Sequence, residues 1–373
     1  MKWISILSLV SGLALVSECS QAQDWPALWK SYTAAYVDNQ VRVIDHDAQD
    51  RTTSEGQAYG MFFALVANDR SRFDGLLHWT ESNLAGGDLT AHLPAWSWGR
   101  DKNNKWGVLD PNSASDADVW IAYTLLAAGK AWKDAHYTTV GTRLAKRIAA
   151  EEVVEIPGLG ATLLPGAQGF ANGGVYRLNP SYLPVQLFVQ LGHELPDGPW
   201  RQIAAHIPAI VRGASPQGFA TDWVEFRPAK GFTPSAVGSY DAIRVYLWAG
   251  MLDPATPDRG ELLKAISGMA HHLRTTSVPP SIVKPDGSVQ DATSPVGFSA
   301  ALLPYLSALG ENDAKDQQMS RVRQGFDVKS GLYGKPPKYY DENLTLFGLG
   351  WVERQFWFDA EGRLATAWQN HGQ

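Results

Sequence analysis

Residues 116–132 read DADVWIAYTLLAAGKAW, and after the two leading aspartates they are apolar on nearly every side of a helix. A helix of this kind is buried all round. Residues 136–151, HYTTVGTRLAKRIAAE, follow it, and there Val140, Leu144 and Ile148 form one apolar stripe among polar residues. Such a helix covers a core with one face only. The two stretches therefore predict an inner helix followed by an outer one.

The same pairing recurs along the chain at roughly 60-residue intervals. We expect inner helices to begin near residues 55, 116, 180, 240, 297 and 341, and an amphipathic segment follows each of them except the last. The amphipathic segment 25–38 can supply the missing outer helix and close a ring. The pattern predicts an all-α fold, with one domain over residues 23–373 and two helical domains as the alternative.

The ring predicts where functional loops lie. Inner helices that are separated by antiparallel outer helices run parallel to one another, so their N-termini collect at one rim. Long connectors rich in Gly, Pro and aromatic residues, such as 86–111 and 157–179, come just before those N-termini. Functional loops are therefore expected on a single face.

The first residues indicate export. Lys2 precedes an apolar run over residues 4–16, and small residues follow, as in a secretory signal peptide that we place at residues 1–22. The only cysteine, Cys19, lies in that segment, so the mature chain has no thiol chemistry. No later apolar run reaches the roughly 18 residues of a membrane span. We expect the mature protein to be a monomer that is located in the periplasm or secreted.

Charge and composition narrow the ligand class. The net charge of −6 provides no positive field for nucleic acid. The chain has 15 Trp, 13 Tyr and 13 Phe, and flat aromatic faces are surfaces on which sugar rings stack. Most of these rings can equally be packing residues.

Three acidic sites open inner helices. Glu55, Asp116 and Asp241 each stand at such an N-terminus, where a carboxylate can simply cap backbone amides. On one rim, however, like charges among aromatic rings push one pKa up and leave another group ionised, which suits acid–base hydrolysis of a glycosidic bond. The aromatic residues expected at this rim are Tyr59, Trp96, Trp98, Tyr182, Tyr240 and Tyr340.

Other chemistries find less support. The chain has no H-E-x-x-H zinc pattern, and its one loose calcium-loop likeness, at Asp45, Asp47 and Asp50, lacks the glycine and the terminal glutamate of such a loop. A serine nucleophile has no G-x-S-x-G turn. We expect neither a metal nor a cofactor.

Three segments resemble glycoside hydrolase family 8. Residues 114–132 resemble the family signature, with Thr124 departing where that signature prefers Ser or Ala. Residues 53–60 are similar to the segment that bears the proton donor, and residues 240–244 to the one that bears the general base in cellulase-type members. Segments 42–45, 93–96, 179–184 and 339–341 are also in register, so the resemblance covers nearly the whole mature chain.

The resemblance implies a six-hairpin α/α barrel that cleaves β-1,4-glucan within the chain, with inversion and without a metal. Glu55 would be the general acid, Asp241 the general base for water, and Asp116 a carboxylate that holds the distorted sugar. Arg244, one turn beyond Asp241, can keep that carboxylate ionised or can form an ordinary surface ion pair. The aromatic residues of the rim would contact the substrate.

Two alternatives stay open. The family scaffold also serves chitosan, xylan and mixed-linkage glucan, and composition does not choose among them. A catalytically silent glycan-binding subunit of an export complex is the other, although retention of both Glu55 and Asp241 argues against it. Likeness to the periplasmic cellulases of bacterial cellulose synthesis operons suggests proximity to a cellulose synthase.

Overall fold

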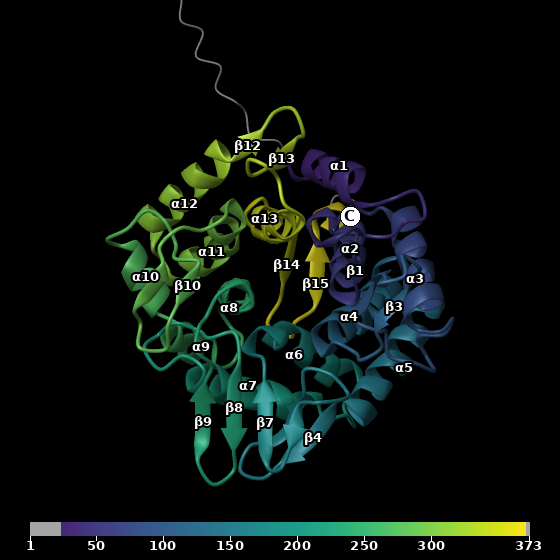
Figure 1. Ribbon diagram of the computed structural model, residues 1–373, viewed down its shortest axis with the longest axis horizontal. Coiled ribbons are helices and arrows are strands. Elements are labelled where there is room, and N and C mark those ends of the chain that lie inside the picture. The colour runs from purple at the N-terminus through teal and green to yellow at the C-terminus, as the bar shows by residue number, and fades with distance from the viewer. Residues whose placement is uncertain (1–23, 371–373) are drawn as a thin grey trace, which may run out of the picture.

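The computed structural model describes residues 24–370, so the expected signal segment and Cys19 lie outside the described residues. Two concentric layers of helices form an α/α barrel (Figure 1). The inner helices begin close to the expected positions, and they are α2 (Ser54–Val66), α4 (Ser115–Ala131), α6 (Val185–Glu194), α8 (Ala242–Gly250), α11 (Val296–Leu309) and α13 (Tyr339–Val352). Each is buried over most of its circumference, as the continuous apolar runs require.

The outer layer confirms the alternation. Its helices bury one stripe each, and they are α3 (Arg70–Leu84), α5 (Ala135–Glu151), α7 (Trp200–Gly213), α9 (Arg259–Ala265), α10 (Gly268–Leu273), α12 (Asn312–Gln324) and α1 (Trp25–Tyr36). Helix α1 supplies the last outer position, because Trp25 Nε1 donates to the Leu346 carbonyl of α13 at 2.8 Å. The first and last elements thereby close the ring.

Two boundaries differ from the sequence pattern. Helix α6 begins at Val185 rather than near 180, because Pro184 restricts the residue before it and a short 3₁₀ turn, η2 (Pro180–Tyr182), comes first. The outer segment after α8 divides into α9 and α10. The helix is interrupted at Gly268, the first residue of α10. The Gly268 N–H donates to the Gly218 carbonyl at 2.8 Å and not to a carbonyl of the preceding turn.

Aromatic rings fill the centre of the barrel. Phe62 of α2 stacks with Phe347 of α13 at 5.4 Å between centroids, and Trp120 of α4 lies 5.3 Å from Trp248 of α8. A hairpin near the C-terminus, β14 (Phe356–Phe358) and β15 (Leu364–Thr366), enters this centre, where Phe356 contacts Phe62 (Figure 1). The helical pattern did not predict this hairpin.

The connectors carry small antiparallel sheets. One has the order β1 (Thr52–Thr53), β2 (Ser97–Arg100), β3 (Trp106–Asp110), and a second has the order β6 (Ala171–Asn172), β7 (Val175–Leu178), β8 (Val224–Arg227), β9 (Gly231–Pro234). Both lie in the long connectors that lead to inner helices. The remaining pairs are β4 (Val153–Ile156) with β5 (Gly160–Leu163), β10 (Ile282–Val283) with β11 (Val289–Asp291), and β12 (Phe326–Asp327) with β13 (Leu332–Tyr333); short helices are η1 (His46–Ala48) and α14 (Ala367–Asn370).

Candidate active site

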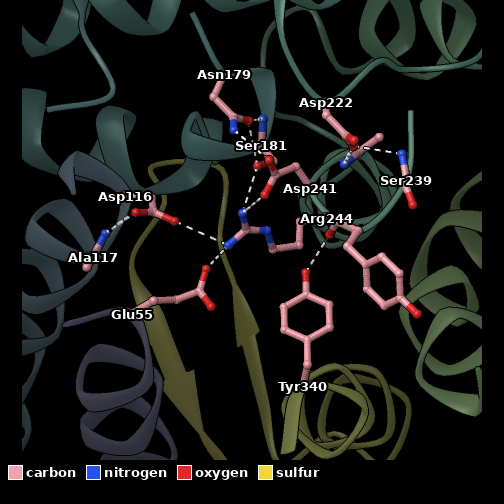
Figure 2. A network of polar contacts seen from close by, with 12 residues as sticks. Glu55, Asp116, Ala117, Asn179, Ser181, Asp222, Ser239, Asp241, Arg244 and Tyr340 are labelled. Carbon is pink, nitrogen blue, oxygen red and sulfur yellow. Dashed lines mark hydrogen bonds and ion pairs between the residues drawn. The ribbon is translucent and has the colours of Figure 1, made fainter. Parts of the chain in front are cut away.

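Three carboxylates from three inner helices meet at one buried guanidinium. Nη1 of Arg244 donates to Glu55 Oε2 and, at 3.2 Å, to Asp116 Oδ2. Nη2 donates to Asp241 Oδ1 at 2.8 Å. Figure 2 shows Glu55 and Asp241 reaching Arg244 from different sides, with Asp116 beside them. The structure therefore brings together the three acidic residues singled out in the sequence.

The separation of the acid and base candidates is bounded by this geometry. Glu55 and Asp241 bind the two terminal nitrogens of one rigid, planar guanidinium, so their contacting oxygens lie within about 8 Å of each other. This upper bound is compatible with the roughly 6.5–9.5 Å of inverting glycosidases and also with the roughly 5–5.5 Å of retaining ones. The side chain of Glu55 is 22% exposed and that of Asp241 is 31% exposed, so both are open to solvent.

Helix capping does not account for Glu55. The cap of α2 is Thr53, whose hydroxyl oxygen accepts from the Gly56 N–H at 3.1 Å. The Glu55 carboxylate is thus free to point away from the helix end toward Arg244. Asp116 retains a partial capping role, because its Oδ1 accepts from the Ala117 N–H at 2.8 Å while Oδ2 faces Arg244.

Capping does not account for Asp241 either. Asp222, on the preceding connector, accepts from the N–H groups of Ser239 and Ala242 at 2.7 and 2.9 Å (Figure 2). This carboxylate caps α8 from outside the helix, which leaves both oxygens of Asp241 available for the site. No local pattern marks Asp222, because the helix it caps begins twenty residues later in the chain.

Two polar residues of the site were not singled out in the sequence. Asn179 donates from Nδ2 to Asp241 Oδ2 at 3.1 Å, and Ser181 Oγ accepts from Arg244 Nη2 at 3.0 Å. Ser181 in turn donates to Asn179 Oδ1 at 2.7 Å. Both residues are 2% exposed. The sequence feature that could have indicated them is the pair of polar residues on either side of Pro180, just before an inner helix.

Burial sets the charge state of Asp116. Desolvation raises the pKa of Asp116 to about 7, against the lowering effect of Arg244 and with a smaller raising effect from Glu55. The sequence argument expected repulsion between like charges to raise a pKa at the rim, whereas the largest cause at Asp116 is burial. Arg244 is itself 2% exposed, and its carboxylate partners hold its pKa well above the usual range despite that burial.

The four predicted tyrosines have three kinds of surroundings. Tyr59 is buried, and its hydroxyl accepts from Arg244 Nη1 at 3.1 Å, so it positions the guanidinium. Tyr182 presents its ring 5.7 Å from the Arg244 guanidinium carbon. Tyr240 and Tyr340 form a pair with centroids 5.9 Å apart, and the Tyr340 hydroxyl donates to the Tyr240 carbonyl at 2.6 Å. Tyr240 is 51% exposed at the rim.

The two predicted tryptophans lie on the connector before α4. The Trp96 N–H donates to the Asn112 carbonyl at 2.8 Å, and the Trp96 ring is half-buried. Trp98 stacks with Trp106 at 4.9 Å and meets Trp79 of the outer helix α3 at 5.2 Å. The Trp98 ring thus packs against Trp106 of β3 and Trp79 of α3.

A cavity of about 450 Å³ lies elsewhere, between α6, α7 and the turn of the β14–β15 hairpin. Its lining includes Val189, Pro208 and Leu262, and none of the three converging carboxylates. The chemistry therefore belongs to the rim and not to this cavity. In the described part of the chain, no group of three or more His, Cys, Asp or Glu residues has the arrangement of a metal site.

Carboxylates that converge at one rim beside the exposed ring of Tyr240 are the groups that inverting or retaining glycoside hydrolases use. Comparison with known proteins identifies the family. Residues 5–354 match the family described as Glycosyl hydrolases family 8, and the chain belongs to this family.

Relatives and solved structures agree with that assignment. The chain is 44% identical to an endoglucanase of Salmonella typhi over 98% of this chain and 96% of that protein, and 43% identical to one of Escherichia coli K12 with the same coverage. The crystal structure of an endo-1,4-D-glucanase from Vibrio fischeri ES114 superposes with a TM-score of 0.82 at 38% identity, covering 91% of this chain and 99% of that one. No helix within residues 24–370 is long and apolar enough to cross a bilayer.

Proposed function

We propose that the chain is an exported, inverting endo-β-1,4-glucanase whose catalytic unit is the single domain 23–373. The observation that carries the proposal is the meeting of Glu55 and Asp241, from α2 and α8, at the two nitrogens of Arg244. Membership of family 8 and the endoglucanase names of the full-length relatives support the reaction and the substrate class.

In this proposal Glu55 protonates the oxygen of the scissile bond. Asp241 removes a proton from the water that attacks the anomeric carbon from the opposite face. Both Asp241 oxygens accept hydrogen bonds, from Arg244 and Asn179, and these bonds orient the carboxylate. When Glu55 takes up the proton that it must donate, Arg244 still has Asp116 and Asp241 as partners.

Asp116 holds the sugar at the reacting position. Its buried carboxyl is fixed by the Ala117 N–H and by Arg244, so it presents a preorganised group to a sugar hydroxyl. Tyr182, Tyr240 and Tyr340 surround the site and provide stacking faces for neighbouring sugar units. Trp96, which is half-buried on the connector before α4, extends the candidate binding surface, and Trp98 supports that connector by packing against Trp79 and Trp106.

The test is hydrolysis of a polysaccharide panel. Reducing ends are measured on soluble cellulose, mixed-linkage glucan, xylan and chitosan, and the anomer formed first is identified by proton NMR. We expect the highest kcat/KM on soluble cellulose, with the α-anomer as first product. A preference for chitosan or xylan would contradict the proposed substrate. A first product of β configuration would contradict the proposed inverting mechanism. No hydrolysis of any member would favour the silent glycan-binding subunit.

Export and a link to cellulose synthesis form the less direct part of the proposal. They rest on the signal-like residues 1–22 and on the likeness to cellulases of synthesis operons. Fractionation of cells that express the full chain, with N-terminal sequencing of the product, tests the export. A product that keeps residues 1–22 and stays in the cytoplasm would contradict it.

A further inference from the structure

A second pair of carboxyl groups lies behind Asp116, and the proposed mechanism uses neither of them. Asp118 is in the first turn of α4, and Glu152 follows the last residue of α5. Both are 0% exposed. The two carboxyl groups lie close enough to shift each other's pKa through a side-chain hydrogen bond.

Among the described residues, no Lys, Arg or His is one of the main influences on the pKa of either group. Within residues 24–370, both oxygens of Asp118 and Oε2 of Glu152 receive no N–H or hydroxyl hydrogen bond. The charged groups that act on the pair are Asp116 and Glu151, both carboxylates, and Glu151 is paired with Arg147 at the surface. Two adjacent negative charges in such a site are strongly unfavourable, whereas one shared proton removes a charge and creates a hydrogen bond.

The pKa directions agree with this geometry. Burial raises the pKa of Glu152 to about 8 and the pKa of Asp118 well above its usual range. The contact between the two groups adds to the effect on Asp118. At neutral pH the pair therefore retains a proton.

The pair is hydrogen-bonded to the segment that leads to the active site. Ser113 donates its hydroxyl to Glu152 Oε1 at 2.5 Å, and the same hydroxyl oxygen accepts from the Ala167 N–H at 3.0 Å. The Ser115 N–H donates to the Pro165 carbonyl at 3.0 Å. The Ser113 hydroxyl, three residues before Asp116, thus links Glu152 to the loop at Ala167.

The connection continues to the general acid. The Asn112 carbonyl accepts from the Trp96 N–H at 2.8 Å, and the Trp96 carbonyl accepts from the Ser54 N–H at 3.0 Å. Ser54 directly precedes Glu55. The buried pair is therefore connected to the starts of α4 and α2, which carry Asp116 and Glu55, by hydrogen bonds and by the peptide link between Asn112 and Ser113.

We propose that Asp118 and Glu152 share one proton and act as positioning residues, and that loss of this proton at alkaline pH releases Ser113 and misplaces the helix starts that carry Asp116 and Glu55. The catalytic consequence rests on the proposed function. The shared proton does not, because it follows from the contacts and burial of the pair.

Two neutral substitutions test the pair, with a neighbouring residue as control. In Glu152→Gln and Asp118→Asn the new amide donates to the remaining carboxylate, so the pair keeps one negative charge at neutral and alkaline pH. We expect kcat within about threefold of the parent at pH 6, and a variant-to-parent kcat ratio that rises by roughly tenfold toward pH 9. Glu155→Gln is the control, because it removes an exposed carboxylate on β4 that is not among the groups acting on the pair, and its variant-to-parent kcat ratio should not change with pH.

Infrared spectroscopy tests the proton without any catalytic assay. The difference between the parent chain and the double variant Asp118→Asn, Glu152→Gln at pH 7 should contain a protonated-carboxyl band that titrates on the alkaline side. Absence of that band overturns the shared proton, whatever the enzyme hydrolyses. If the band is present but no glycan is cleaved, the proposed function fails and the proton assignment stands.

The link through Ser113 has its own variant, which leaves the pair intact. Ser113→Ala should lower kcat by roughly tenfold with KM changed less than threefold, while the infrared band persists. Parent-like kcat in Ser113→Ala, or kcat ratios of Glu152→Gln and Asp118→Asn that do not change with pH, would overturn the positioning role. Should a pair variant fail to fold, the Ser113→Ala result still decides that role.

Discussion

Replacing Arg244 by glutamine should destabilise the fold in a pH-dependent manner. Arg244 is 2% exposed and donates hydrogen bonds to Glu55, Asp116 and Asp241. Removing the cation from a buried ion pair typically costs about 3–5 kcal/mol because the partner charge is left uncompensated. Asp116 dominates this loss, since its side chain is 3% exposed whereas the other two carboxylates contact solvent.

The pH dependence follows from Asp116. Its pKa is raised to about 7, so at pH 5 it is protonated with or without Arg244, and the variant loses mainly hydrogen bonds. At pH 8 the parent holds an ionised Asp116 against Arg244, whereas the variant must bury that charge alone or keep the proton. A tenfold change in proton affinity corresponds to about 1.4 kcal/mol, so the loss at pH 8 should exceed that at pH 5 by at least about 1 kcal/mol.

Urea unfolding at pH 5 and pH 8 measures this difference. Arg363→Gln is the matched control, because Arg363 also binds two carboxylates, Asp359 and Glu361, but its side chain is 59% exposed. The control should change the free energy of unfolding little at either pH. An equal loss at both pH values for Arg244→Gln, or a loss no larger than that of the control, would refute the assigned role of Asp116 and Arg244.

Three further outcomes are expected. Glu55→Gln and Asp241→Asn should each lower kcat on soluble cellulose by roughly a hundredfold or more with an unchanged circular dichroism spectrum, and near-parental turnover in either would remove that residue from the mechanism. Asp116→Asn should weaken catalysis, and mass spectrometry after incubation with a fluorinated glycoside should find no adduct on the parent; a stable adduct on Asp116 would show a retaining enzyme. Because Cys19 lies in the expected signal segment, the melting temperature of the mature chain should not respond to reductant, and activity should not respond to a chelator.

The sequence predicted the two-layer architecture because burial patterns are local. A helix that is apolar all round, such as residues 116–132, has to be enclosed, and one with a single stripe, such as 136–151, has to cover it. The recurrence of this pair predicted six inner helices, and α1 takes the outer position assigned to residues 25–38. The β14–β15 hairpin escaped prediction because its strands are short and its place in the barrel centre depends on contacts with α2.

The candidate site, like the fold, was predicted from the sequence only in part. Residue type and position at helix starts were enough to select Glu55, Asp116 and Asp241, because parallel inner helices must present their N-termini at one rim. The sequence did not show which of these three side chains would be buried. Desolvation depends on what the rest of the fold places around a side chain, and it raises the pKa of Asp116 to about 7.

By itself, then, the sequence determined the helical periodicity, the order of inner and outer layers, the shared rim and the types of chemical group that stand there. The tertiary structure alone decided the partners. Arg244 and Glu55 are 189 positions apart, Asp222 caps a helix that begins twenty residues later, and the Asp118–Glu152 pair joins the start of one helix to the end of the next. Periodicity is a property of neighbouring residues, whereas hydrogen bonding and desolvation depend on which distant segments the closed ring brings into contact.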